Sequence, residues 1–134
     1  MIEVRNLHKS FGNSQVLKGI STIFEKGKTN LIIGQSGSGK TVLLKCLLGL
    51  FDYQKGSIGY DNKLFLSLSA NEKRTLRSKI GMVFQGGALF DSLSIAENVM
   101  FPLKMFTKQS KSEMEERVNS ALKRVNLENA HQKM

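Results

Sequence analysis

The chain has 134 residues, 40% of them apolar and 23% charged, a composition that suits one globular domain and excludes a disordered or fibrous chain. Twenty Lys and Arg against eleven Asp and Glu give a formal net charge of +9, but the basic residues are scattered and lack the interleaved aromatic residues of a nucleic-acid platform. We therefore expect no nucleic-acid partner. The only cysteine, Cys46, excludes an internal disulfide, and its apolar neighbours predict a small buried side chain.

The sequence shows no sign of a membrane span or a leader. No apolar run approaches the ~18 residues that a membrane-spanning helix needs. Residues 1–7 alternate between apolar and polar types and include Glu3 and Arg5, which is typical of a strand and not of a signal peptide. The sequence therefore predicts a cytosolic protein, or one that is attached to a membrane through a partner.

The first third of the chain predicts a hairpin, a short strand, a loop and a helix. Apolar positions in residues 2–7 and 16–24 indicate two strands joined by a polar turn. Residues 30–33 predict a short buried strand, and residues 34–39 a glycine-rich loop. Residues 40–50 predict a helix that is apolar on nearly every side, so we expect it to be covered on more than one face.

The middle of the chain predicts shorter elements. Residues 57–60 and 64–68 have the pattern of extended segments, and residues 70–77 that of a helix. Residues 80–84 predict a second buried strand. A loop should follow, because Gly86 and its neighbour Gly87 interrupt the apolar pattern.

Two further helices are expected in the last third. Ser94 with Glu97, and Ser110 with Glu113, have the spacing of a capping box, in which a serine and a glutamate satisfy the first backbone N–H groups of a helix. Pro102 should limit the first of these helices. The second helix carries apolar residues at helical spacing and should bury one stripe, formed by Met114, Val118, Ala121, Leu122 and Val125.

One motif carries clear chemistry, the pattern G-x-x-x-x-G-K-[ST]. It is formed by Gly34, Gln35, Ser36, Gly37, Ser38, Gly39, Lys40 and Thr41. The glycines allow consecutive backbone N–H groups to point at phosphate oxygens, and the start of the following helix adds positive partial charge. In this motif the lysine binds the β- and γ-phosphates, and the threonine hydroxyl ligates Mg²⁺. The sequence therefore predicts a P-loop that holds the phosphates of ATP together with Mg²⁺.

The motifs taken in order resemble the N-terminal half of the ATP-binding subunit of an ABC transporter. The resemblance rests on the P-loop, on Phe11 upstream, and on the run Val83-Phe84-Gln85 with the loop after it. It implies an α/β fold, a P-loop NTPase of ABC ATPase type, of which this chain holds an antiparallel β subdomain, part of the P-loop sheet and the start of the helical subdomain. The chain would be one partial nucleotide-binding domain, with the β subdomain and P-loop core in residues 1–93 and the helical subdomain beginning in residues 94–134.

Within that family, three segments are most similar to the ATPase of Mla/Mce phospholipid-transport systems. They are residues 85–90, residues 95–99 and the pair Pro102-Leu103. The resemblance thus implies lipid transport driven by ATP hydrolysis, a homodimer in the full-length protein, and a place at the inner, cytoplasmic face of the cell membrane.

The same resemblance assigns roles to residues outside the P-loop. Phe11 would stack on adenine with Val16 packed nearby, although a hairpin phenylalanine can also belong to the core. Gln85 would contact Mg²⁺ and the attacking water, so that it and Lys40 form the catalytic set, although loops also favour glutamine for its polarity. The loop after Gln85 would contact a transmembrane permease subunit, or else its apolar residues 88–90 would form the core of a small domain.

Several motifs of the family have no counterpart in these 134 residues. The signature, the Walker B aspartate, the catalytic glutamate and the switch histidine would follow Met134. His8 and His131 do not occupy the switch position, and Glu128 does not follow a buried strand. We therefore expect the chain to be a fragment of a longer ATPase that holds ATP but does not hydrolyse it alone.

Two other functions stay open at this point. The chain could be an ATP-binding module without catalysis, or a small P-loop phosphotransferase in which Asp91 acts as the acid or base. A GTPase is disfavoured, because Asn62-Lys63 is followed by Leu64-Phe65 and not by the aspartate of a guanine-reading motif.

Overall fold

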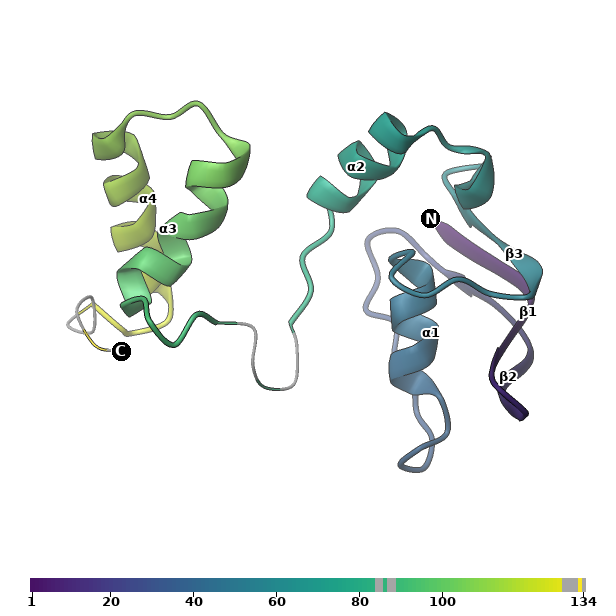
Figure 1. Ribbon diagram of the computed structural model, residues 1–134. Coiled ribbons are helices and arrows are strands. Elements are labelled where there is room, and N and C mark those ends of the chain that lie inside the picture. Colours follow the sequence, from purple (N-terminus) through teal and green to yellow (C-terminus); the bar gives the residue numbers. More distant parts are fainter. Residues whose placement is uncertain (84–85, 87–88, 129–132, 134) are drawn as a thin grey trace. The chain divides into compact units, whose positions relative to one another are not determined.

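The computed structural model describes residues 1–83, 86, 89–128 and 133. The chain divides into two compact units, Met1–Gly81 and Met82–Met134 (Figure 1). The first unit holds a sheet and two α-helices, and the second holds two α-helices. The subdomain division that the resemblance implies, at residues 93 and 94, stays a prediction.

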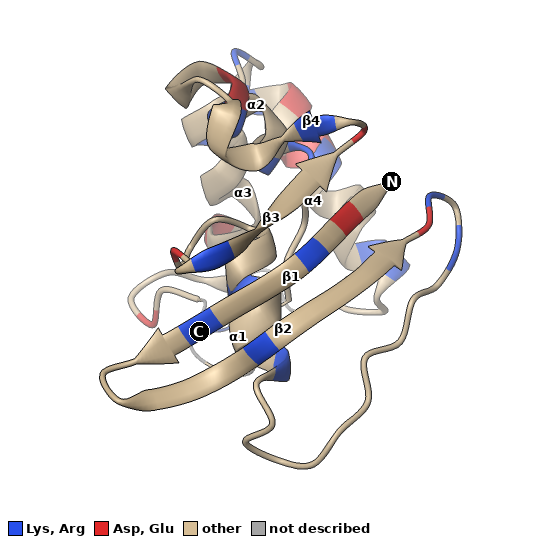
Figure 2. Ribbon diagram, turned by 90° about the vertical axis from the view of Figure 1, so that its right-hand side faces the viewer, with Lys and Arg blue, Asp and Glu red and all other residues tan. Residues whose placement is uncertain are grey.

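An antiparallel sheet forms one layer of the first unit. Its strands are β1 (Ile2–Phe11), β2 (Ser14–Phe24), β3 (Lys55–Tyr60) and β4 (Lys63–Leu64), in the order β2-β1-β3-β4. The helix α1 (Lys40–Leu47) lies behind this sheet in the view of Figure 2. The predicted hairpin and the predicted antiparallel β subdomain are therefore confirmed.

A bulge in β1 explains how the sheet builds its core. Val4 and Leu7 are both buried, yet residues three apart on a regular strand point to opposite faces. The pairing of β1 with β2 shifts between these two residues, and Asn6 between them has a φ of 45°. The bulge adds one residue and so returns Leu7 to the core face. Gly56 lies against it, since a Cβ there would be 2.3 Å from the Asn6 carbonyl oxygen.

The core of the first unit joins this face of the sheet to one side of α1. Its buried members are Val4, Leu7, Leu17, Leu43, Cys46, Leu47, Ile58, Tyr60 and Phe65. The prediction that Cys46 is buried is confirmed, and burial raises the pKa of its thiol. The Tyr60 hydroxyl donates a hydrogen bond to the Leu47 carbonyl, which satisfies a polar atom that burial would otherwise leave unpaired.

A second helix closes the end of α1. After the 3₁₀ turn η1 (Phe65–Ser67), the helix α2 (Ala70–Ser78) presents Arg77, whose Nε and Nη2 donate to the carbonyls of Leu48 and Gly49 at 3.0 and 2.9 Å. The helix predicted in residues 70–77 is confirmed. The extended segment predicted in residues 64–68 is only partly right, because the 3₁₀ turn replaces most of it.

The second unit contains α3 (Ile95–Phe106) and α4 (Lys111–Arg124), and both predicted capping boxes are present. Pro102 lies inside α3, so the expectation that it limits this helix was wrong. A proline removes one backbone donor, and the remaining hydrogen bonds carry the helix four residues further. Of the predicted apolar stripe on α4, Val118 and Leu122 are buried, whereas Ala121 and Val125 are exposed.

Two predicted strands are not formed by the described residues. Residues 30–33 and 80–83 carry no strand assignment, and the side chains of Leu31, Ile33 and Val83 are 83%, 82% and 97% exposed. A strand needs a neighbour for its backbone hydrogen bonds, and none of the described strands pairs with either segment.

The helix α1 is shorter and more open than predicted. It ends at Leu47, and its side chains Leu43, Cys46 and Leu47 are buried against the sheet. Leu44 on the same helix is 41% exposed, and Leu50 beyond it is 52% exposed. The expectation that several faces are covered was therefore wrong for the described residues, because the sheet contacts only one side.

Candidate functional site

The residues of the P-loop motif connect the unpaired segment 29–33 to the start of α1. Within the loop, the Ser38 backbone N–H donates to the Gln35 carbonyl at 3.2 Å, which closes a tight turn. Gly39 is the N-cap of α1, and its carbonyl accepts from the Leu43 N–H at 2.8 Å. The loop therefore turns the chain directly into the helix, as the motif requires.

Gly39 lies directly against strand β2. Its φ of 96° is in the left-handed region, and a Cβ there would be 2.9 Å from Cγ1 of Val16 and 3.1 Å from Cδ2 of Leu17. Only a residue without a side chain fits this position without displacement. The structure thus brings Val16 to the end of the P-loop, while its nearness to a bound base stays a prediction.

Lys40 folds back over the loop that precedes it. Its ammonium Nζ donates to the carbonyls of Gly34 and Gln35 at 2.8 and 2.7 Å. These bonds hold a positive charge at the loop, next to the first backbone N–H groups of α1. Thr41, the next residue, is exposed in the first turn of the helix, and its role as a Mg²⁺ ligand stays a prediction.

The start of α1 differs from the starts of the three other α-helices among the described residues. Each of α2, α3 and α4 has a serine N-cap and a glutamate in its first turn, namely Glu72, Glu97 and Glu113. In contrast, α1 has no side-chain cap and no acidic residue in its first turn. Its first N–H groups and its positive dipole end are therefore left for an external anion.

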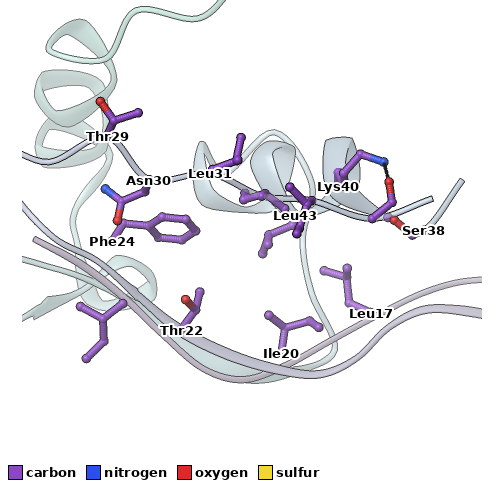
Figure 3. A pocket seen from close by; sticks show the side chains of 15 residues that line it. Leu17, Ile20, Thr22, Phe24, Thr29, Asn30, Leu31, Ser38, Lys40 and Leu43 are labelled. Atoms are coloured by element: carbon purple, nitrogen blue, oxygen red, sulfur yellow. Dashed lines mark hydrogen bonds between the residues drawn. The ribbon is translucent and has the colours of Figure 1, made fainter. Parts of the chain in front are cut away.

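A hollow of about 680 Å³ lies beside the loop, between β2, the segment 29–34 and α1 (Figure 3). Most of its lining is apolar and includes Ile20, Phe24, Leu31 and Leu43. Such a surface does not suit phosphate, which needs N–H groups and cations. The predicted phosphate site is the loop itself and the start of α1, and Lys40 is among the residues that line the hollow.

Phe11, the predicted adenine-stacking residue, ends β1 and is 45% exposed. The alternative that it belongs to the hairpin core was wrong, since the core cluster does not include it. Its ring packs edge to face with Phe51, with 5.3 Å between the centroids. Sequence reasoning missed Phe51, because it lies far along the chain and no local pattern links the two residues.

The remaining predicted site features lie in the second unit. Gln85 and Ala88 are outside the described residues. In the loop after them, the rings of Phe90 and Phe101 are 4.7 Å apart, and the Phe90 N–H donates to Asn98 Oδ1 at 2.8 Å. Leu89 is 71% exposed, so this part of the loop presents apolar surface.

Neither a cluster of metal-binding side chains nor a membrane-spanning helix is present among the described residues. These residues contain no group of three or more His, Cys, Asp or Glu side chains able to hold a metal ion. The two residues predicted to ligate Mg²⁺, Thr41 and Gln85, are not of these four types, and Gln85 lies outside the described residues. Within the same part of the chain, no helix is long and apolar enough to cross a membrane.

The fold and the loop define a nucleotide-binding P-loop protein, and comparison with known proteins narrows the class. Residues 17–134 match the family described as ABC transporter. The chain is 43% identical over 129 residues to the methionine import ATP-binding protein MetN of Clostridium tetani (strain Massachusetts / E88), covering 96% of this chain and 40% of that protein. It is 38% identical over 134 residues to the protein TRIGALACTOSYLDIACYLGLYCEROL 3, chloroplastic, of Arabidopsis thaliana, covering 100% of this chain and 39% of that protein.

A solved structure agrees with these relatives. The dimeric post-hydrolysis state of the ATP-binding cassette MJ0796, bound to ADP and Pi, superposes with a TM-score of 0.84 at 30% identity, covering 99% of this chain and 62% of that one. The chain belongs to the ABC transporter family, and its fold is that of the N-terminal half of an ABC ATPase cassette. It spans about two fifths of the length of the two relatives described above.

Proposed function

We propose that this chain binds Mg-ATP as the N-terminal part of an ABC transporter's ATP-binding subunit. The observation that carries the proposal is the start of α1, where Gly39 provides no side-chain cap and the Lys40 ammonium donates to two carbonyls of the loop. A triphosphate provides the anion that this arrangement lacks. The likeness to a cassette bound to ADP and Pi, the products of ATP hydrolysis, supports an adenine nucleotide as the ligand.

Each predicted site residue has a part in this proposal. The P-loop N–H groups and Lys40 hold the β- and γ-phosphates, and the Thr41 hydroxyl ligates Mg²⁺. Phe11 stacks on adenine, with Val16 beside the end of the loop. Gln85 contacts the metal and the attacking water. The resemblance assigns no catalytic glutamate to these 134 residues, so we propose that the chain alone binds ATP without turning it over.

The whole protein's partners and cargo belong to the proposal as well. The loop after Gln85 contacts a transmembrane permease, two full-length subunits pair, and the complex works at the cytoplasmic face of the membrane. Phospholipid is the proposed cargo, supported by the Mla/Mce-like segments and by the likeness to a protein named after a galactolipid. The likeness to a methionine importer favours methionine as a different cargo. A comparison of two permeases distinguishes the two cargoes: a lipid-system permease, and not a methionine permease, should stimulate ATP hydrolysis by the full-length subunit.

The binding proposal is tested with the 134-residue chain and titration calorimetry. Mg-ATP should bind the wild type, and Lys40→Ala should weaken that binding at least about tenfold, because a charge-assisted contact is worth roughly 1.5–3 kcal/mol. Lys18→Ala is the matched control, since it removes the same charge from an exposed position on β2. Equal affinities for all three proteins would contradict the proposal. Magnesium-dependent hydrolysis that disappears in Lys40→Ala would refute the claim that the chain is catalytically incomplete.

A further inference from the structure

Two phenylalanine rings connect the tip of the β1–β2 hairpin to the segment after α1. The rings of Phe11 and Phe51 lie 5.3 Å apart at 75°, the edge-to-face arrangement that the charge distribution of aromatic rings favours. Phe51 is partly buried and packs against the core of the first unit, whereas Phe11 stays 45% exposed. Phe51 is thus fixed by the core, and it restricts the orientation of a ring that is otherwise open to solvent.

Two lysines complete the cluster around this pair. The Lys9 ammonium lies 4.7 Å from the centroid of Phe11 and 5.9 Å from that of Phe51. The Lys45 ammonium lies 5.0 Å from the centroid of Phe51. The distances from Lys9 to the Phe11 ring and from Lys45 to the Phe51 ring are within the range of cation–π attraction. Because Lys9 is on β1 and Lys45 is on α1, the cluster ties the hairpin to the helix that begins at the P-loop.

We infer that Phe51 is a positioning residue for the base of the bound nucleotide. Its contact holds Phe11 in one orientation before the ligand arrives, so that Phe11 presents the rest of its exposed surface to the base. A phenylalanine at a hairpin end without such a support has to give up side-chain freedom on binding, and this ordering reduces affinity. The inference rests on the proposed function, because it assigns Phe51 a role through Phe11 in the same site.

The test compares two ligands that share the phosphates and differ in the base. Titration calorimetry on the 134-residue chain measures the affinity for Mg-ATP and for Mg-bound inorganic triphosphate. Phe51→Ala should weaken Mg-ATP binding by about 2- to 10-fold, the value of one edge-to-face pair. It should leave the affinity for inorganic triphosphate unchanged. Phe51→Tyr keeps the ring and should restore the affinity for Mg-ATP.

A double-substitution cycle isolates the route through Phe11. In a Phe11→Ala background, Phe51→Ala should cause no further loss of Mg-ATP affinity, because the ring that it supports is already gone. Leu50→Ala is the matched control, since Leu50 precedes Phe51 and is 52% exposed. Phe51→Leu keeps the apolar cover of the core, so it provides the ligand comparison if the alanine variant unfolds.

The outcomes separate this inference from the proposed function. Equal weakening of both ligands by Phe51→Ala, or additive losses in the cycle, would overturn the positioning role and leave Phe51 a structural residue. If triphosphate binding depends on Lys40 but the affinity for Mg-ATP is unchanged in Phe51→Ala, only the inference fails. If the wild type binds neither ligand, the proposed function fails and the inference fails with it.

Discussion

Gly39 and Val16 are in such close contact that a single added carbon at Gly39 would lie 2.9 Å from the valine Cγ1. The start of α1 therefore rests on β2, and the P-loop is anchored by packing as well as by its own hydrogen bonds. The same residue is the N-cap of α1, so this contact also positions the turn that we propose binds phosphate.

Gly39→Ala should lower the free energy of unfolding by about 1–3 kcal/mol, since it adds a side chain at a left-handed φ and in a space already filled. Urea unfolding followed by circular dichroism measures the change. Gly37→Ala is the matched control: its φ is 78°, but an added Cβ there meets nothing within 4 Å. A Gly37→Ala variant that loses as much stability as Gly39→Ala would show that the contact with Val16 does not matter.

Arg77 caps the C-terminal end of α1 through the carbonyls of Leu48 and Gly49. Arg77→Ala should cost about 1 kcal/mol of stability, because two acceptors lose a charged donor at an exposed helix end. Arg77→Lys should recover part of the loss, since a single ammonium can reach one carbonyl but lacks the fork of the guanidinium. Arg74→Ala is the control, because it removes an exposed arginine from α2, the helix that also carries Arg77. It should change the unfolding midpoint little.

Tyr60 makes the first unit sensitive to alkali. Burial raises the pKa of its hydroxyl to about 12, above the value of about 10 in an unfolded chain. The neutral hydroxyl therefore stabilises the fold fully below pH 10 or so, and this contribution is lost as the pH rises toward 12, by about 2–3 kcal/mol in total.

Tyr60→Phe provides the check on the alkaline effect. It should cost about 1–2 kcal/mol at neutral pH, because the Leu47 carbonyl loses its donor. Between pH 10 and 12 or so, its stability should fall less steeply than that of the wild type. Some slope should remain, since burial also raises the pKa of Tyr53. Identical slopes for the two proteins would contradict the assignment to Tyr60.

The capping boxes make the helices sensitive to acid. A hydrogen bond from the Ser110 backbone, and then one from its hydroxyl, lowers the pKa of Glu113, and the same contacts lower the pKa of Glu97 at Ser94. A lowered pKa gives stability that is present above the unfolded value of about 4.3 and lost as the pH falls below it. Helix content measured by circular dichroism should thus be flat near neutral pH and decline in acid.

Ser110→Ala tests the cap of α4. It should destabilise the helix by about 1 kcal/mol at neutral pH and should also weaken the acid dependence, because Glu113 loses its side-chain partner. Ser120→Ala, in the last half of the same helix, is the control. Equal acid profiles for the two variants would argue against the capping box as the source.

The parts of the fold that sequence predicted well are those whose cause lies within a few residues. A serine and a glutamate three residues apart fix the start of α3 and of α4, and the glycine spacing of the P-loop sets its turn. The prediction of strands at residues 30–33 and 80–84 was wrong for the described residues. A strand depends on a neighbouring strand, which no local sequence pattern specifies. The Phe11–Phe51 contact was missed for the same reason.

The Lys40 ammonium donates hydrogen bonds to two carbonyls of its own loop, at 2.8 and 2.7 Å. The ammonium has three N–H donors, so these two bonds leave one donor for a phosphate oxygen, and the lysine can bind a ligand without releasing its own loop. The bonds to the carbonyls of Gly34 and Gln35 then hold the ammonium at the loop, so residues 34 and 35 should keep their shape when a triphosphate binds.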